Sequence, residues 1–297
     1  MSVINLSYII ATRNRLSFLQ VTLPRLIAAL APGEEIVVVD GNSSDGAKEY
    51  LQQLFSEGKI HQFISEPDRN QAHAWNKAML MARGQIIKKV IDDDVFDYQA
   101  IRSCSNFMLE NPEIDVCISN LLCGAVNDPE NIWTDNRLTN FQEWAAGKRH
   151  VFHFSDVHLL VRKASLSYIG LYDTQFTMMD WEYSLRITYL KCRVAYFTGY
   201  NAISVGNPFN VTSGASKALL KAEGIIGHTK YSFAGDRAEI SLYSKLKIAV
   251  GTFLHSLKAK KNIVQTLPAQ AELQLIYDNY YRAISEKNHN TKTEFFV

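Results

Sequence analysis

The sequence predicts an α/β fold in which a doubly wound, mainly parallel sheet is flanked by helices and followed by a mostly helical C-terminal region. Three observations predict this fold class. Short β-branched segments alternate with stretches of helical periodicity, and each such segment ends in a polar turn. The chain of 297 residues, 47% of them hydrophobic, is also long enough for one large α/β domain or two smaller ones.

Three segments of the N-terminal third begin as apolar strands and end in polar turns. They are SYIIATRNR (7–15), EIVVVDGNSSDG (35–46) and QIIKKVIDDD (85–94). Apolar residues at three and four spacing predict the helices that alternate with them, Leu16 to Leu30, Ala47 to Glu57 and Gln71 to Ala82. Parallel strands end at one edge of a sheet, where ligands bind. The turns Thr12 to Arg15, Asp40 to Asp45 and Asp92 to Asp94 should therefore converge on one crevice.

The middle of the chain continues this alternation less regularly. The elements expected there are a helix from Asp97 to Leu109, a strand from Ile114 to Gly124, a strand from Phe154 to Val161, a helix from Met178 to Lys191 and a strand from Val194 to Tyr200. The polar, aromatic-rich stretch from Ala125 to His150 has no assignable pattern. From about Gly206 onward the chain is expected to be mostly helical.

Composition limits the classes of function. The chain has 31 Lys and Arg residues and 30 Asp and Glu residues, so it has no overall positive charge that would attract nucleic acid. The four cysteines form no CxxC pair, and we expect them to be small buried hydrophobes in a reducing compartment. The N-terminus is expected to form a strand and not a signal peptide, and no stretch reaches the roughly 20 apolar residues of a membrane span. We therefore expect a cytoplasmic protein that at most lies on a membrane.

The C-terminal region carries its own charge. Between Lys217 and Lys261, nine Lys or Arg residues stand against three Asp or Glu, a net +6 that leaves −5 for the rest of the chain. Ser241 to Leu257 places apolar residues along one helical face, with lysines beside and after it. Two interpretations are open. Segment 241–261 is an interfacial helix that attracts anionic lipid, or it is a core-packed helix with a solvated basic end.

Two acidic turns are candidates for a ligand site. Asp40 at the carboxyl end of a strand suits hydrogen bonds to a base or ribose, although a lone Asp there is more often a turn former or N-cap. Asp92, Asp93 and Asp94 are either a solvated acidic turn that caps the next helix or hard oxygen ligands for Mg²⁺ or Mn²⁺, which would hold a diphosphate. No GxGxxG follows the first strand and no GxxxxGK[ST] occurs, which argues against a dinucleotide-binding Rossmann domain and a P-loop.

Three longer stretches carry a family resemblance. They are VVVDGNSSDGAKEYL (37–51), EPDRNQAHAWNKAMLMARGQIIKKVIDDD (66–94) and IGLYDTQFTMMDWEYSLR (169–186). In this order and spacing they resemble the inverting family-two glycosyltransferases of the GT-A fold, and within that family the bacterial enzymes that build polysaccharides and O-antigens. The resemblance covers roughly the first two thirds of the chain. It implies a nucleotide-sugar donor, with a UDP-sugar favoured, and Mn²⁺ or Mg²⁺ as cofactor.

The resemblance assigns the donor side of the site residue by residue. It implies a base and ribose pocket lined by Ala11, Thr12 and Arg13. It also implies that Asp40 contacts the base, and that Asp68 and Arg69, which match the family's EPDRG stretch, lie near the donor. The DxD element falls on Asp92 to Asp94.

Within that element, Asp94 is the favoured direct metal ligand. Asp92 is the other candidate ligand and faces the sugar or ribose, while Asp93 either belongs to the donor site or points into solvent. Asp180 matches the catalytic base of the family's acidic motif, although the residues alone favour an N-cap of the following helix. The acceptor side would include the next two residues, Trp181 and Glu182.

The chain also departs from the family pattern. Asn70 stands where relatives commonly have Gly after DR, and His73 and AWNKA (74–78) replace their Asp and AMNKG. The family's usual sugar should therefore not be assumed. The family's His before the second-half strand is shifted or absent, with Asp156 and His158 nearby.

The resemblance implies a metal-dependent inverting hexosyl- or N-acetylhexosaminyltransferase. Its acceptor would be a saccharide hydroxyl, on a lipid-linked intermediate of cell-surface polysaccharide such as O-antigen or lipopolysaccharide, at the inner face of the cell membrane. Residues 1–96 would bind the nucleotide sugar, 97–205 would supply the acceptor site and base, and 206–297 would form a helical basic region. Two alternatives are a sugar nucleotidyltransferase, although ATRNR lacks the Gly that class needs, and an inactive protein that binds nucleotide sugar or glycan. The sequence makes no prediction of oligomeric state.

Overall fold

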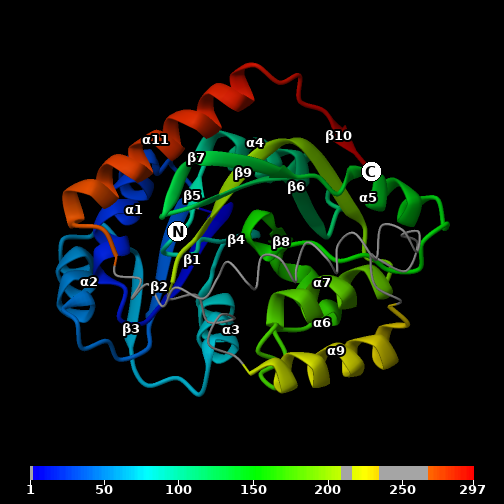
Figure 1. Ribbon diagram of the computed structural model, residues 1–297, viewed down its shortest axis with the longest axis horizontal. Coiled ribbons are helices and arrows are strands. Elements are labelled where there is room, and N and C mark those ends of the chain that lie inside the picture. Colours follow the sequence, from blue (N-terminus) through cyan, green and yellow to red (C-terminus); the bar gives the residue numbers. More distant parts are fainter. Residues whose placement is uncertain (1–2, 209–215, 234–266) are drawn as a thin grey trace, which may run out of the picture.

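The computed structural model describes residues 3–208, 216–233 and 267–297 (Figure 1). Its N-terminal part is built on four parallel strands, β1 (Leu6–Thr12), β2 (Glu34–Asp40), β3 (Gln62–Ser65) and β4 (Ile86–Lys89). Strand β1 lies between β2 and β4, and Ile9 is in register with both Val37 and Lys89. The connecting helices are α1 (Leu16–Ala29), α2 (Ala47–Ser56) and α3 (Gln71–Met81). The expected strand, turn and helix units are thus confirmed.

Alternate residues of these strands belong to two separate apolar clusters. One cluster contains Tyr8, Ile10, Ile36 and Val38 together with residues of α1 and α2. The other contains Ile9, Val37 and Val39 together with residues of α3. Because successive side chains of a strand point to opposite faces, the sheet is covered by helices on both sides, which is the doubly wound arrangement.

The middle of the chain extends the same sheet. Its elements are β5 (Val95–Phe96), α4 (Tyr98–Glu110), β6 (Val116–Ala125), β7 (Asp128–Asp135), α5 (Leu138–Ala145), β8 (Leu160–Arg162), α6 (Leu166–Ile169), α7 (Met179–Tyr189) and β9 (Val194–Gly206). Strand β8 lies between β4 and β6 and is antiparallel to both, whereas β6 and β9 are parallel. The predicted α/β class with a mainly parallel sheet is confirmed, and antiparallel pairs are confined to β8 and the short or peripheral strands.

Several strands differ from their expected positions. Strand β8 begins at Leu160 and not at Phe154, because Phe152 and Phe154 are buried in a loop and residues 156–158 form a 3₁₀ turn. Strand β9 continues past Tyr200 to Gly206, since its polar residue Asn201 is buried and donates a hydrogen bond to the His158 carbonyl. Strand β3 was not predicted, and its residues are all half-buried at the edge of the sheet, which removes any alternation of polarity. The unassigned stretch 125–150 contains β7 and α5.

The described C-terminal residues form α9 (Lys217–Tyr231), α11 (Gln270–His289) and the short strand β10 (Phe295–Phe296). Helix α11 packs against α1, β5 and β9, and α9 packs against α7 at the opposite side of the molecule (Figure 1). In the described part of the chain the main strand order is β10-β9-β6-β8-β4-β1-β2-β3, with β5 paired to β9 and β7 paired to β6. The mostly helical character expected after Gly206 holds for the described part, while segment 241–261 lies outside it. Among the helices that the structure describes, none has the length and apolarity to cross a bilayer.

Candidate active site

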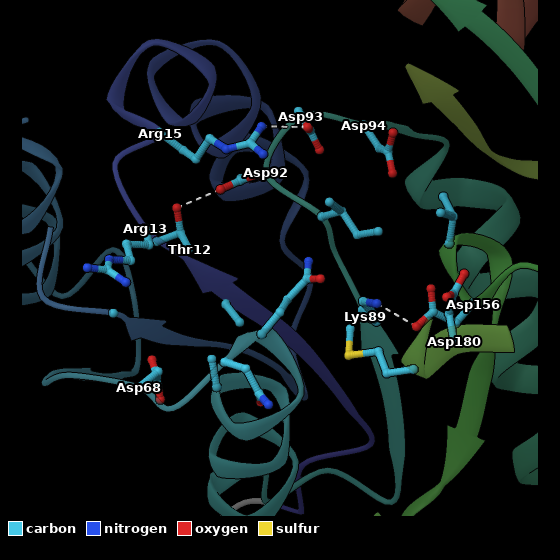
Figure 2. Close-up of a pocket in the computed structure, with 18 of the residues that line it drawn as sticks. Thr12, Arg13, Arg15, Asp68, Lys89, Asp92, Asp93, Asp94, Asp156 and Asp180 are labelled. Carbon is cyan, nitrogen blue, oxygen red and sulfur yellow. Dashed lines mark hydrogen bonds and ion pairs between the residues drawn. The ribbon is translucent and has the colours of Figure 1, made fainter. Parts of the chain in front are cut away.

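A cavity of about 600 Å³ opens at the carboxyl ends of β1 and β4, where the sequence predicted the polar turns to meet (Figure 2). Its volume is within the range of small-molecule sites. The predicted site residues that line it are Ala11, Thr12, Arg13, Asp68, Arg69, Asp92, Asp93, Asp94 and Asp180. Two of the three predicted turns contribute several side chains each, whereas the turn that follows β2 contributes Gly41.

The turns after β1 and β2 are bound to each other. The Asn14 N–H donates to Ser43 Oγ at 2.8 Å, and Asn14 Oδ1 accepts from the Ser44 N–H at 2.8 Å. A Cβ atom at Gly41 would lie 3.2 Å from the Arg13 side chain and 3.3 Å from Asp68 Oδ2. The missing side chain at Gly41 therefore lets Arg13 and Asp68 approach each other at one end of the cavity.

Asp92 and Asp94 are held by hydrogen bonds from separate elements. Thr12 Oγ1 at the end of β1 donates to Asp92 Oδ2 at 2.6 Å, and Thr22 Oγ1 of α1 donates to the Asp92 carbonyl at 3.0 Å. The Val205 N–H of β9 donates to Asp94 Oδ1 at 2.7 Å. Among the described residues, no side chain or N–H donates a hydrogen bond to Asp94 Oδ2. That oxygen is therefore available to a ligand in the cavity.

Asp93 does not point into solvent, so that interpretation was wrong. Its side chain is buried, and its Oδ2 lies 2.7 Å from Arg15 Nη1 and 2.6 Å from Asn207 Nδ2. The Tyr277 hydroxyl of α11 also donates to the Asp93 carbonyl at 2.5 Å. Arg15 was inside a turn that the sequence singled out, but Asn207 and Tyr277 are distant in sequence and belong to no motif.

Burial and like charge act on the two outer aspartates of the triplet. Burial and the neighbouring Asp93 carboxylate raise the pKa of Asp92 to about 7 and raise the pKa of Asp94 well above its ordinary value. Among the described residues, no three His, Cys, Asp or Glu side chains form a metal-binding cage. Mg²⁺ and Mn²⁺ are commonly held by one or two carboxylates together with substrate phosphates, and two buried carboxylates with an available oxygen fit that pattern.

Asp180 lies on the opposite wall of the cavity, in the first turn of α7. Met178 occupies the N-cap position, so the alternative of Asp180 as N-cap was wrong. The N–H groups of Thr177 and Met178 instead donate to the carboxylate of Glu223 on α9, at 2.7 and 2.9 Å. Burial and the adjacent Asp156 raise the pKa of Asp180. Sequence reasoning missed Glu223, because nothing local marks an acid that caps a distant helix.

A buried lysine lies between the two walls. Lys89 Nζ at the end of β4 is 2.5 Å from Asp156 Oδ2, which also accepts from the Tyr172 hydroxyl at 2.7 Å. Both Lys89 and Asp156 line the cavity. The sequence carried a signal, since two consecutive lysines interrupt an otherwise apolar strand before the acidic triplet. The first of them, Lys88, is also fully buried and donates to the Val157 carbonyl.

Three predicted site residues do not line the cavity. Asp40 is fully buried, and its carboxylate accepts hydrogen bonds from Ser43 and from Ser65 Oγ, the latter at 2.6 Å. Glu182 is fully buried and pairs with Arg186 and Tyr231. Trp181 packs against α9, where a Cβ atom on Gly227 would lie 2.3 Å from its ring. The contact of Asp40 with a base and the acceptor-side role of Trp181 and Glu182 stay predictions.

Solved structures of similar fold include proteins with bound nucleotide sugars. The S. aureus protein TarS, residues 1–349 in complex with UDP-GlcNAc, has 15% sequence identity and a TM-score of 0.57, over 95% of this chain and 90% of that one. The mannosyltransferase PcManGT from Pyrobaculum calidifontis, in complex with GDP-Man and Mn²⁺, has 17% identity and a TM-score of 0.51, over 98% and 88%. At these identities the similarity establishes the fold.

The sequence itself matches a family over more than half of its length. No curated protein is significantly similar to it. The model of the family described as Glycosyl transferase family 2, however, matches residues 7–170, from β1 to the end of α6. This range includes both the acidic triplet and the Lys89–Asp156 pair. The chain therefore belongs to glycosyl transferase family 2.

Proposed function

We propose that this protein is a metal-dependent, inverting glycosyltransferase that moves a hexosyl or N-acetylhexosaminyl group from a nucleotide sugar to a saccharide hydroxyl. Membership of glycosyl transferase family 2 supports the reaction class. The observation that carries the proposal is that Asp92 and Asp94, from the loop after β4, and Asp180, from α7, line a single cavity.

The donor is proposed to lie along the ends of β1 and β4. Its base and ribose would contact Ala11, Thr12 and Arg13, with Asp40 and Asp68 behind them, and its diphosphate would lie between the exposed Arg69 and the acidic triplet. Asp94 and Asp92 would hold Mn²⁺ or Mg²⁺, which supplies positive charge where negative charge grows on the leaving diphosphate. TarS binds UDP-GlcNAc and PcManGT binds GDP-Man, so the fold accepts either base, and we propose a UDP-sugar.

Asp180 is proposed to act as the general base. Its ionised carboxylate would accept the proton of the acceptor hydroxyl as that oxygen attacks the anomeric carbon from the side opposite the leaving group. The hydroxyl becomes acidic as the new C–O bond forms, so a carboxylate is a sufficient base. A single displacement inverts the configuration. The neighbouring Asp156 is paired through its Oδ2 with Lys89 and Tyr172, whereas no such ion pair is formed by Asp180 among the described residues.

The finer assignment concerns the acceptor and its location. We propose a saccharide on a lipid carrier, in the synthesis of a bacterial cell-surface polysaccharide of the O-antigen or lipopolysaccharide type, at the inner face of the cell membrane. In this proposal residues 1–96 bind the donor, 97–205 supply the base and acceptor side, and 206–297 form a helical, basic region whose segment 241–261 would meet the membrane. The basic balance of residues 217–261 supports an anionic surface as partner.

The test is the identity of the released product. Purified protein with a nucleotide sugar, a saccharide acceptor mixture and Mn²⁺ should release nucleoside diphosphate, and chelation of the metal should stop the release. A parallel reaction with a nucleoside triphosphate and a sugar 1-phosphate tests the alternative, since release of pyrophosphate there would identify a sugar nucleotidyltransferase. Donor binding without any turnover would identify an inactive binding protein.

The donor can be identified without knowing the acceptor. Melting temperatures should be compared across UDP-, GDP- and other nucleotide sugars in Mn²⁺, because only a ligand of the folded state raises the melting temperature. We expect UDP-sugars to give the largest rise. A larger rise with a GDP-sugar would show that the donor carries guanine and not uracil, and it would leave the proposed reaction class unchanged.

A further inference from the structure

Two carboxylates and one ammonium form a charge cluster on the wall of the cavity, and the ammonium also interacts electrostatically with the carboxyl of Asp94. Asp156 and Asp180 lie next to each other at the end of the Lys89 side chain (Figure 2). Lys89 Nζ is 2.5 Å from Asp156 Oδ2, and the side chains of Lys89 and Asp156 are 5% and 3% exposed. Water therefore screens this cluster poorly, and the charges act on one another strongly.

The lysine is held in place by aromatic rings. Its Nζ lies 4.5 Å from the centre of the Trp75 ring and 5.3 Å from that of Tyr172, and the Tyr172 hydroxyl donates to the same Asp156 oxygen at 2.7 Å. The other groups that pack against the cluster do not replace this charge. Glu223 of α9 is bonded to backbone N–H groups, and Lys88 points to the Val157 carbonyl.

We propose that Lys89 is a positioning residue that keeps Asp180 ionised by neutralising the adjacent carboxylate of Asp156. The inference rests on the proposed role of Asp180 as general base. Two carboxylates that share a site do not both ionise readily, and they retain a proton between them unless a cation is present. A proton retained on Asp180 would leave it unable to accept one from the acceptor hydroxyl.

The electrostatic balance at Asp180 supports this assignment. Burial and Asp156 raise the pKa of Asp180, and Lys89 is the foremost group acting in the opposite direction. The net charge of the three groups is −1, so the second carboxylate stays ionised only because Lys89 cancels the first. Tyr172 contributes a hydrogen bond and no charge, since burial raises the pKa of its hydroxyl well above the ordinary value.

A titration of the carboxylates tests the inference without a donor or acceptor. Protein labelled with carbon-13 at the Asp carboxyls should be followed by NMR from about pH 4 to about pH 9, with Asp156→Asn and Asp180→Asn used to assign the two signals. Lys89→Met should move the titration of Asp180 to higher pH by about one to three pH units, and Lys89→Arg should leave it near its original position.

Charge-balanced variants separate electrostatics from structure. The double variant Lys89→Met with Asp156→Asn removes both charges, so Asp180 should titrate at clearly lower pH than in Lys89→Met alone. Tyr172→Phe is the matched control, because it removes a donor to Asp156 without changing charge and should produce a much smaller shift. If Lys89→Met does not fold, Asp156→Asn alone should still lower the titration of Asp180. An unchanged Asp180 titration in Lys89→Met or Asp156→Asn overturns the inference.

A kinetic readout links the cluster to turnover. The acidic limb of kcat, followed as UDP release from UDP-GlcNAc in Mn²⁺, should move with the NMR titration, so that Lys89→Met loses about tenfold or more near pH 6 and recovers at higher pH. The two proposals can be refuted separately. Turnover retained by Asp180→Asn would show that Asp180 is not the general base. An unshifted Asp180 titration in Lys89→Met, with Asp180→Asn inactive, would refute only the role of Lys89.

Discussion

The three consecutive aspartates after β4 have three different sets of partners. Asp93 is tied to Arg15 and Asn207, Asp92 accepts from Thr12, and Asp94 has an oxygen to which no described group donates. An oxygen that is already paired with a guanidinium is a poor cation ligand, because the cation would have to displace that pair. We therefore expect the middle aspartate to fix the loop and the outer two to hold the proposed metal.

This difference predicts opposite behaviour for two conservative variants. Asp94→Asn should fold and lose the rise in melting temperature that Mn²⁺ produces in the original protein, because a neutral amide replaces the favoured ligand. Asp93→Asn should lower the free energy of unfolding by about 1 to 3 kcal/mol, since it weakens a largely buried charged hydrogen bond, and should still respond to Mn²⁺. Melting curves with and without Mn²⁺ check both, and a full Mn²⁺ response in Asp94→Asn would remove it as the principal ligand.

Asp180 is the residue on which the proposed reaction depends. Asp180→Asn should reduce kcat by about 10²- to 10⁴-fold, because the amide cannot accept a proton, while the donor should still raise the melting temperature. Asp173→Asn is the control, since Asp173 precedes the same helix and only caps the Gln175 N–H. Release of nucleoside diphosphate measures the effect. Equal rates in the two variants would rule out Asp180 as the base.

The pH dependence of kcat follows from the same carboxyl. Burial and Asp156 raise the pKa of Asp180, and a general base must be deprotonated to act. Activity should therefore be present at neutral pH and should fall as the pH decreases through a value above the ordinary Asp range near 4. A kcat profile measured with saturating donor and Mn²⁺ checks this. An acidic limb at or below the ordinary value would contradict the assignment.

At the scale of elements, α11 acts on the acidic loop from outside the family-matched region. Its Tyr277 hydroxyl donates to the Asp93 carbonyl, and Asn288 donates to Asp97, the N-cap of α4, at 2.8 Å. One helix, more than 170 residues away in sequence, thus holds the middle of the loop that carries the triplet and the start of the helix that follows it. We infer that α11 orders the acidic loop in addition to covering the sheet.

This role of α11 is testable with two tyrosines one turn apart. Tyr277→Phe should cost about 1 kcal/mol of unfolding free energy and should weaken the Mn²⁺-dependent binding of donor, because the Asp93 carbonyl loses its donor. Tyr280→Phe loses a comparable bond, to the Ala125 carbonyl, away from the triplet, so it should lose stability without weakening donor binding. Chemical denaturation measures the loss of stability and donor titration measures the affinity for the donor. Equal donor affinity in both variants would argue against a role of the Tyr277 contact in ordering the acidic loop.

The elements that the sequence predicted correctly are those with local signals. Units such as β1 with α1 and β2 with α2 show apolar periodicity and a polar turn, and they are found within a few residues of their expected limits. Strand β8 was misplaced because Phe152 and Phe154 are apolar for burial and not for strand formation. The residues of the candidate active site divide in the same way, into those with a local sequence signal and those without one. Asp92, Asp94 and Asp180 lie in motifs, whereas the partners Glu223 and Tyr277 are brought to them only by the tertiary fold.

At the scale of the whole molecule, the outer face of α9 combines exposed apolar side chains with basic ones. Helix α9 buries Glu223, Gly227 and Tyr231 against α7, and turns apolar side chains outward. These are Leu219, Ile225 and Ile226, at 43%, 58% and 50% exposure. The exposed residues Lys221, His228 and Lys230 flank them in the sequence. An apolar stripe bordered by basic residues complements an anionic lipid surface, which binds both kinds of side chain.

We therefore expect α9 to contribute to binding of a membrane. The full-length protein should float with liposomes that contain anionic phospholipid, less so at high salt and with neutral lipid. Ile225→Asp with Ile226→Asp should reduce flotation several-fold, because each charge would enter the acyl boundary. Leu275→Asp is the matched control, since Leu275 is 60% exposed on α11, away from this stripe, and should float normally. If the double variant floats as well as the control, α9 is not the docking face, and if it instead abolishes a dimer seen in sedimentation, a second copy of the chain covers the stripe.

Because Glu223 of the same helix holds the N–H groups of Thr177 and Met178, a membrane bound at α9 would lie directly behind the start of the helix that carries Asp180.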